Sequence, residues 1–407
     1  MKVKQLAVSS WQLAMCSWRY QNGLKRHLFM LFLMVSFSLH SQDLIQAHKI
    51  VDSLTSTYFW GRGYTNNGMN KAADFIEAEL KSYGVKPMRG SNYQQEFFYA
   101  VNTFPGKMDV VVDGKPLKPG VDFIIGPESS GRKAKGNLLL HDSIHFIDVK
   151  SKIEVTLRDK LTWSVATEAI NYTRVEILKK RLTSPPQKIE VNIENRFQPN
   201  FKSSNVGGII KGTEKPDSLI IITAHYDHLG GMGSKTYFPG ANDNAGGVAL
   251  LLELAKYYSQ HPAKYSIAFI AFGGEEAGLV GSKFFVDNPL VPLKNIRFLI
   301  NLDLVGTGNE GATVVNASLY KMEFNLLNEI NTQHQYLTKL KSRGKAANSD
   351  HYWFTEKGVP SFFIYAMGGI QAYHDVFDNG ETLPLTEFED LFRLIVAFND
   401  RLMANQH

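Results

Sequence analysis

From about residue 204 onward, continuous apolar runs alternate with amphipathic segments, and this alternation constrains the fold more than any other feature of the sequence. Continuous runs of this kind are typical of strands that are buried on both faces of a sheet. Such runs, including SLIIITAH and YSIAFIAF, predict strands at 218–225, 265–272, 296–306, 313–317 and 360–366. Helices are predicted at 245–260, from 277 to 288 and at 384–403. Strands that alternate with helices predict an α/β domain with a mainly parallel central sheet flanked by helices.

The first half of the chain has a different pattern. Residues 43–85 have apolar residues at helical spacing, and Gly84 is expected to end this helical region. Residues 88–200 read as short strands separated by glycine and proline turns, with one helix predicted within 160–182. We therefore expect residues 42–99 to be an N-terminal helical part of the main domain, 100–200 a β-rich insert or small subdomain, and 201–407 the main α/β domain.

Residues 1–41 have the layout of a secretory signal peptide. They carry five basic residues and no acidic one, and Lys25 and Arg26 precede an apolar run of about 12 residues. That run is short for a membrane span, which needs about 20 residues. We expect cleavage near Ser41 and a secreted or periplasmic mature protein without stable membrane association; an uncleaved membrane anchor is the alternative.

Removal of that segment changes the charge and the cysteine count. Taking its five basic residues from the 44 Lys and Arg leaves 39, equal to the 39 Asp and Glu. A nucleic-acid-binding protein usually keeps a basic surplus, so nucleic acid is not an expected partner. The single cysteine, Cys16, lies in the same segment. Any metal in the mature chain must therefore be held by His, Asp and Glu.

Acidic residues and histidines follow each predicted core strand. The first strand leads into His225 and Asp227, and the second into Glu275 and Glu276. The third leads into Asp303, while Asp243 and His374 lie in later loops. Because ligands of parallel α/β sheets bind beyond the carboxyl ends of the strands, we expect these side chains to lie close together.

Two histidines and three carboxylates make a good ligand set for Zn²⁺ or a similar divalent ion. One zinc needs about three protein ligands, so five ligands suit two ions that share a carboxylate. Each residue taken singly has an ordinary alternative, such as a helix cap for Asp243 or a surface loop histidine for His374.

Six motifs resemble the zinc aminopeptidase/carboxypeptidase family of the M28 type. In chain order they are HYDHLG, GANDNAGG, AFGGEEAGLVGS, NLDLVG, SDHYWF and AYHDVFD. The resemblance covers about residues 204–405, and GMNKAADFIEAELKSYGV resembles the family's N-terminal helix. It implies a zinc-exopeptidase fold, two Zn²⁺ per chain, peptide or protein substrates and a hydrolytic reaction. The insert resembles a reduced protease-associated domain in its position, and LKPGVDFIIGPESSG resembles that domain's opening.

The resemblance also implies roles for individual residues. His225 and Asp303 would hold one zinc, Glu276 and His374 the other, and Asp243 would bridge them. Glu275 would be the general base, and Tyr373 would donate to the oxyanion of the tetrahedral intermediate. The Asp227 carboxylate would accept the remaining N–H of His225, and Asp378 is a candidate for the same role at His374. Ser349, Asp350 and His351 match a motif that lines the site, without an assigned task.

Two other functions fit the same motifs. A glutaminyl cyclase would use a single zinc, and a receptor-like relative would keep the fold for binding alone. Because all five ligands and the base are retained, we expect a dizinc metallopeptidase, with aminopeptidase activity favoured over carboxypeptidase activity.

Overall fold

The computed structural model describes residues 44–404. The predicted signal peptide lies outside these residues. Within them, no helix combines the length and the hydropathy that crossing a membrane requires.

The centre of the molecule is a nine-stranded sheet with a parallel middle. In spatial order its strands are β1 (Lys86–Pro87), β12 (Arg196–Ile210), β16 (Tyr265–Phe272), β13 (Lys215–His225), β17 (Ile296–Leu302), β20 (Ser361–Ala366), β18 (Ala312–Val315) and β19 (Leu340–Ser342), with β2 (Gln94–Thr103) beside β12. β13 runs parallel to β16 and β17, and β17 runs parallel to β20. β12 and β18 pair antiparallel with the edges of this parallel core. The predicted fold class, an α/β protein with a mainly parallel centre, is confirmed.

Helices cover both faces of the sheet, which explains the continuous apolar runs. On β13, Ile220 and Ile222 face one core, while Leu219 and Ile221 face the other. The first core includes α2 (Leu44–Thr55), α3 (Gly68–Ser82), α4 (Gly246–Gln260), α6 (Lys321–His334) and α8 (Phe388–Ala404). The second includes α5 (Val280–Asp287) and α7 (His351–Glu356).

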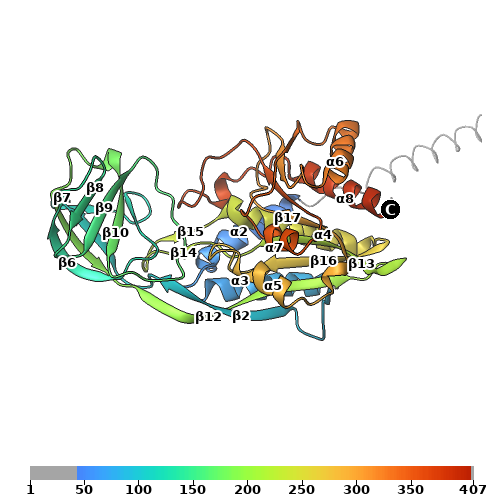
Figure 1. The fold of residues 1–407 in the computed structure, drawn as a ribbon, viewed down its shortest axis with the longest axis horizontal. Coiled ribbons are helices and arrows are strands. Elements are labelled where there is room, and N and C mark those ends of the chain that lie inside the picture. Colours follow the sequence, from blue (N-terminus) through green and yellow to red (C-terminus); the bar gives the residue numbers. More distant parts are fainter. Residues whose placement is uncertain (1–43, 405–407) are drawn as a thin grey trace, which may run out of the picture. The chain divides into compact units, whose positions relative to one another are not determined.

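The residues expected to form a β-rich insert lie in two small sheets, around a second core that also includes Leu229, Met232 and Phe238. One sheet contains, in order, β4 (Lys115–Leu117), β3 (Met108–Val112), β11 (Lys188–Ile193) and β6 (Arg132–Asn137). The other contains β5 (Phe123–Ile125), β10 (Thr173–Leu178), β9 (Ile153–Arg158), β8 (His145–Asp148) and β7 (Leu139–Leu140). Figure 1 shows β6–β10 grouped together, with β2 and β12 running toward them from the main sheet.

The helix predicted within residues 160–182 is wrong. The structure has strand β10 there, followed by a single 3₁₀ turn at Lys179–Arg181. Thr173, Val175 and Ile177 are buried and alternate with more exposed residues, which is the two-residue period of a strand. The helices α6 and α7 were not predicted, because their apolar stripes are short.

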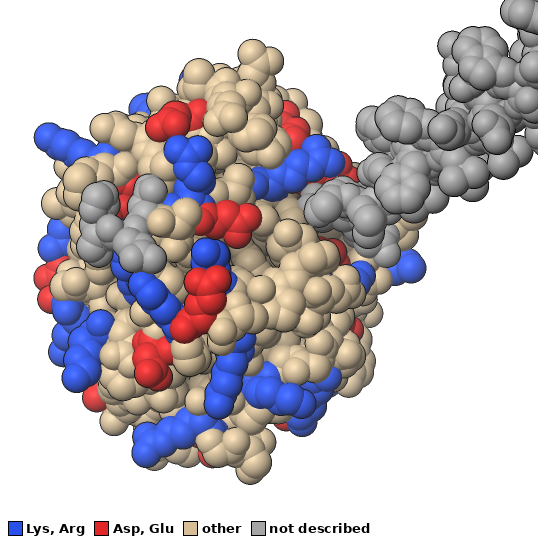
Figure 2. All heavy atoms as spheres, turned by 90° about the vertical axis from the view of Figure 1, so that its right-hand side faces the viewer, with Lys and Arg blue, Asp and Glu red and all other residues tan. Residues whose placement is uncertain are grey.

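On the face shown in Figure 2, basic and acidic side chains are interspersed. Such mixing is typical of an ordinary solvated surface.

Candidate active site

Four neighbouring parallel strands end around one cavity of about 530 Å³. β13 ends at His225, and β17 is followed directly by Asp303. The loop after β16 supplies Glu276, and the loop after β20 supplies His374. Asp243 lies in the turn before α4. His225 and Asp303 are placed by strand ends, as expected at the carboxyl edge of a parallel sheet, and the other ligands lie in the loops and the turn beyond it. The cavity wall includes all five predicted ligands, the predicted base and the predicted oxyanion donor: His225, Asp243, Glu275, Glu276, Asp303, Tyr373 and His374.

Asp243 lies between the two predicted ligand histidines. Its Oδ1 is 3.3 Å from His225 Nε2, and its Oδ2 is 3.0 Å from His374 Nε2. His225 Nε2 is also 3.4 Å from Asp303 Oδ1, and His374 Nε2 is 3.3 Å from Glu276 Oε2. Each imidazole therefore faces two carboxylate oxygens, and Asp243 is common to both groups.

Both imidazoles are oriented by backbone carbonyls. His225 Nδ1 donates to the carbonyl of Asp227 at 3.1 Å, and His374 Nδ1 donates to the carbonyl of Trp163 at 2.9 Å. A carbonyl only accepts, so Nδ1 carries the hydrogen and Nε2 of the neutral ring presents a lone pair. Two lone-pair atoms at about 3 Å repel unless a cation lies between them. The arrangement therefore requires either protonated imidazoles or metal ions.

The pKa shifts show the same demand for positive charge. Burial lowers the pKa of His225, but Asp303, Glu275 and Asp243 outweigh it and hold this pKa well above its usual range. Burial also opposes protonation of His374, yet Glu276 and Asp243 raise its pKa to about 9. Side-chain atoms of His225, Asp243 and Asp303 all lie within 4.8 Å of one another, which suits a shared metal ion. The donor set of imidazole nitrogens and carboxylate oxygens fits zinc.

His228 is a further candidate ligand that sequence reasoning missed. With Asp243 and Glu276 it forms a second group of side-chain atoms within 4.8 Å. Its Nδ1 is 2.7 Å from Glu276 Oε1, and its buried Nε2 has no hydrogen-bond partner among residues 44–404. The second histidine of HYDHLG was the available signal, because it lies three residues after His225.

The backbone of the two adjacent glutamates is fixed by one buried carboxylate, that of Asp227. Asp227 Oδ1 accepts the backbone N–H of Glu275 at 3.1 Å, and its Oδ2 accepts that of Glu276 at 3.2 Å. Gly274, at φ 72°, turns the chain just before them. Glu276 reaches the histidines, while Glu275 lines the cavity. Burial raises the pKa of Glu275 well above its usual range, and the charge of Glu276 adds to this shift.

The expected partners of Asp227 and Asp378 need correction. The Asp227 carboxylate is 3.9 Å from His225 Nδ1, and the carbonyl of the same residue accepts that hydrogen instead. Asp378 accepts the backbone N–H groups of Asn242 and Asp243, at 2.8 and 3.0 Å, rather than a hydrogen from His374. Each carboxylate has two oxygens and binds two consecutive backbone donors, which fixes a ligand-bearing turn more firmly than one ring contact would.

A chain of buried hydrogen bonds gives Ser349 a task. Its hydroxyl donates to Asp303 Oδ2 at 2.9 Å, and it accepts a hydrogen bond from Asn301 Nδ2 at 2.8 Å. Thr223 in turn donates to Asn301 Oδ1 at 2.7 Å. The hydrogen bonds run in one direction, from Thr223 through Asn301 and Ser349 to the Asp303 carboxylate. The chain therefore stabilises the charge and the orientation of Asp303. Asp350 and His351 are buried nearby and lack a comparable contact with a predicted ligand.

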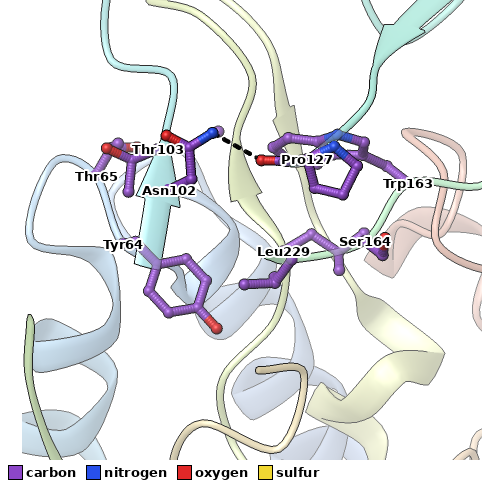
Figure 3. A pocket seen from close by; sticks show the side chains of 10 residues that line it. Tyr64, Thr65, Asn102, Thr103, Pro127, Trp163, Ser164 and Leu229 are labelled. Atoms are coloured by element: carbon purple, nitrogen blue, oxygen red, sulfur yellow. Dashed lines mark hydrogen bonds between the residues drawn. The ribbon is translucent and has the colours of Figure 1, made fainter. Parts of the chain in front are cut away.

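The insert contributes to the site through Trp163. Besides accepting from His374 Nδ1, Trp163 donates its backbone N–H to the carbonyl of His374 at 2.9 Å. Its indole donates to the Ile125 carbonyl at 2.7 Å and stacks on Phe238 at 4.7 Å between ring centroids. Figure 3 shows Trp163 beside Pro127, across a small cavity from Tyr64 and Leu229. The neighbouring Tyr373 ring stacks on His374 at 4.0 Å and is 42% exposed at the rim.

Comparison with known proteins gives relatives of one kind. The profile of peptidase family M28 matches residues 205–399. Aminopeptidase YwaD of Bacillus subtilis is 32% identical over 206 residues, which are 49% of this chain and 44% of that protein. A probable zinc metalloprotease of Pyricularia oryzae is 36% identical over 123 residues, 29% of this chain and 24% of that protein. The chain thus spans less than half the length of these curated relatives.

Two solved structures share the fold across nearly the whole chain. A zinc aminopeptidase from Bacillus subtilis superposes with a TM-score of 0.65 at 18% identity, covering 89% of this chain and 95% of that one. A peptidase M28 precursor from Shewanella amazonensis gives 0.66 at 15% identity, covering 90% and 94%. The ordered motifs, the fold and the profile match agree: residues 205–399 of this chain match the profile of peptidase family M28.

Proposed function

We propose that this protein is a dizinc metallopeptidase, an aminopeptidase that removes N-terminal residues from peptides. The observation that carries the proposal is the position of Asp243, with one carboxylate oxygen facing each of two imidazoles whose Nδ1 hydrogens are already committed. We assign His225 and Asp303 to one zinc, Glu276 and His374 to the other, and Asp243 to both. When bound, two zinc ions polarise the scissile carbonyl and lower the pKa of the attacking water.

The chain's own residues supply the proton transfers. Glu275 lines the same cavity and is not one of the assigned metal ligands, so its carboxylate is available as a base. We assign it the proton of the attacking water, which it then gives to the leaving amine. Tyr373 at the rim is assigned the hydrogen bond to the oxyanion. Asp227 and Asp378 position Glu275 and Asp243 through their backbones.

The choice of an aminopeptidase is supported by the name of one relative, Aminopeptidase YwaD, whose match covers about half of this chain. Secretion or export to a periplasm is part of the same proposal and rests on residues 1–41 alone.

The test compares the full chain with its Glu275→Gln variant. Zinc content is measured by mass spectrometry, and hydrolysis is measured on aminoacyl p-nitroanilides and on their N-acetylated forms. We expect two zinc ions per chain in both proteins, cleavage of the unblocked substrates only, and a loss of roughly 10²–10⁴-fold in kcat for the variant. Asp142→Asn, which changes an exposed carboxylate in the insert, is the control and should keep full activity.

Other outcomes would replace the proposal. One zinc per chain together with cyclisation of N-terminal glutamine would identify a glutaminyl cyclase. Zinc binding without hydrolysis of any substrate would identify a binding protein, and full activity in Glu275→Gln would remove the base from Glu275.

A further inference from the structure

Among residues 44–404, Arg343 is the one Lys or Arg side chain that lines the candidate active-site cavity. It follows β19, and its backbone N–H donates to the carbonyl of Val314 on the neighbouring strand at 3.0 Å. Its Nη1 donates to the hydroxyl of Tyr365 at 3.2 Å, and Tyr365 lines the same cavity. The arginine is therefore anchored at the sheet edge and directed by a tyrosine of β20.

The guanidinium has no ion pair with a carboxylate among residues 44–404. Lys345, two residues further along the same exposed loop, does pair with Glu356. The loop can thus bring a cation to an acidic partner, and Arg343 nevertheless contacts a neutral hydroxyl. A planar guanidinium with free N–H groups is suited to bind a carboxylate through two parallel hydrogen bonds.

The charges of the cavity leave this cation without a counterion. The other ionisable groups of the wall are four carboxylates, two histidines and two tyrosines: Asp243, Glu275, Glu276, Asp303, His225, His374, Tyr365 and Tyr373. Two divalent ions would balance the four carboxylates, so the guanidinium would be the remaining net charge. Leu279, Leu304 and Phe363 make the wall between these polar groups partly apolar, which strengthens a charge pair relative to open water.

We propose that Arg343, directed by Tyr365, binds a carboxylate of the substrate. The substrate class is accordingly peptides with an anionic group near the scissile bond: an acidic N-terminal side chain, or the free carboxyl terminus of a dipeptide. Both present the same chemical group to the guanidinium. This inference rests on the proposed peptidase function of the same cavity.

The two sources of the carboxylate are separated by two pairs of matched substrates. The first pair is glutamyl and glutaminyl p-nitroanilide, which differ in the side-chain charge. The second is Leu-Gly and Leu-Gly amide, which differ in the C-terminal charge. Leucyl p-nitroanilide, which has no carboxylate, is the reference substrate. We expect the full chain to favour the anionic member of one pair by about 10- to 100-fold in kcat/KM, as a charge-assisted hydrogen-bonded pair would give.

Variants then assign the preference to the guanidinium. Arg343→Ala should abolish it through a higher KM for the anionic substrate, and should leave leucyl p-nitroanilide within about twofold. Arg343→Lys should restore part of the preference, because lysine keeps the charge without the planar fork. Lys341→Ala is the matched control, since Lys341 lies on β19 beside Arg343 and does not line the cavity. Equal kcat/KM within both pairs, or an unchanged preference in Arg343→Ala, would overturn the inference.

A failure of the proposed function gives a different result. In that case leucyl p-nitroanilide is not hydrolysed either. Carboxylate recognition is then decided by calorimetric titration of zinc-loaded Glu275→Gln with the dipeptide pair and with the α-amides of glutamate and glutamine, which differ only in the side-chain charge. Tighter binding of an anionic member, lost in the double variant with Arg343→Ala, supports recognition without catalysis. Equal binding within both pairs rejects it.

Discussion

At the scale of single residues, Arg62 is a buried cation next to the site, and its guanidinium requires several hydrogen-bond acceptors. It is fully buried and donates to five backbone carbonyls, which belong to Leu54, Tyr226, Pro239, Gly240 and Asp243. Burial lowers its pKa to about 10, and the nearby carboxylates oppose this shift, so the guanidinium stays charged at neutral pH. One side chain thus links the turn that carries Asp243 to α2 and to the end of β13.

We predict that Arg62→Ala lowers the free energy of unfolding by at least about 3 kcal/mol, because it leaves buried carbonyls without a donor and removes a positive charge from beside the buried carboxylates. It should also weaken zinc binding, since the Asp243 turn loses its support. Urea unfolding and a chelator titration measure the two effects. Arg401→Ala, which removes an exposed ion pair with Glu329, is the control and should cost under about 1 kcal/mol. An Arg62→Ala protein with wild-type stability would contradict this reading of the contacts.

At the scale of elements, the insert is joined to the loop that carries His374. Trp163 and His374 exchange two hydrogen bonds, and Lys160 Nζ donates to the Gln371 carbonyl at 2.8 Å. Val376, in the same loop, packs against the core of the insert. A ligand held by a carbonyl of another substructure depends on how that substructure is packed.

We predict that Trp163→Ala weakens one zinc site selectively, by roughly 10- to 100-fold. Alanine keeps the carbonyl that accepts from His374 Nδ1, but it removes the indole contacts that hold this carbonyl in place. Stepwise chelation should then release one zinc at lower chelator concentration and leave the other near its wild-type affinity. Phe146→Ala is the control: Phe146 is buried in the same insert core on β8, and its loss should destabilise the insert without that selective release. Equal loss of both ions in Trp163→Ala would show that the insert acts only on overall stability.

At the scale of the whole molecule, the ends of four parallel strands converge on a cluster of carboxylates. Asp243, Glu275, Glu276 and Asp303 repel one another there, and the pKa shifts of the two histidines show that positive charge is needed. Ions that bind only the folded chain add their binding free energy to its stability.

Removal of the metal is therefore predicted to lower the melting temperature of the protein. At free zinc 1,000-fold above its Kd, the lost stabilisation per site is about 4 kcal/mol. Calorimetry before chelation, after chelation and after return of zinc measures it, and calcium is the control because these nitrogen-containing sites favour zinc. A melting temperature that does not change while zinc is lost would mean that the cluster is stable without cations.

The spacing of apolar residues along the chain is a local property, and a sequence shows it directly. Much of the fold could therefore be predicted from it. The continuous runs of β13, β16, β17 and β20 predicted a parallel centre, and the residues after each run predicted the wall of the cavity. Where the local period was misread, at residues 160–182, the predicted helix was a strand. The match of residues 205–399 to the profile of peptidase family M28 was likewise predicted by motifs whose order and spacing are written in the sequence.

Tertiary structure alone decided which groups hold those side chains in place. The hydrogen of His225 goes to a carbonyl rather than to the Asp227 carboxylate, and that of His374 goes to Trp163, 211 positions away. Every residue has a carbonyl, so a backbone acceptor leaves no mark in a sequence. Arg62 and Arg343 are ordinary arginines until folding buries the first among carbonyls and places the second in the cavity. Residue types determined the chemistry available to this protein, while the long-range packing of the chain decided the geometry in which it can be used.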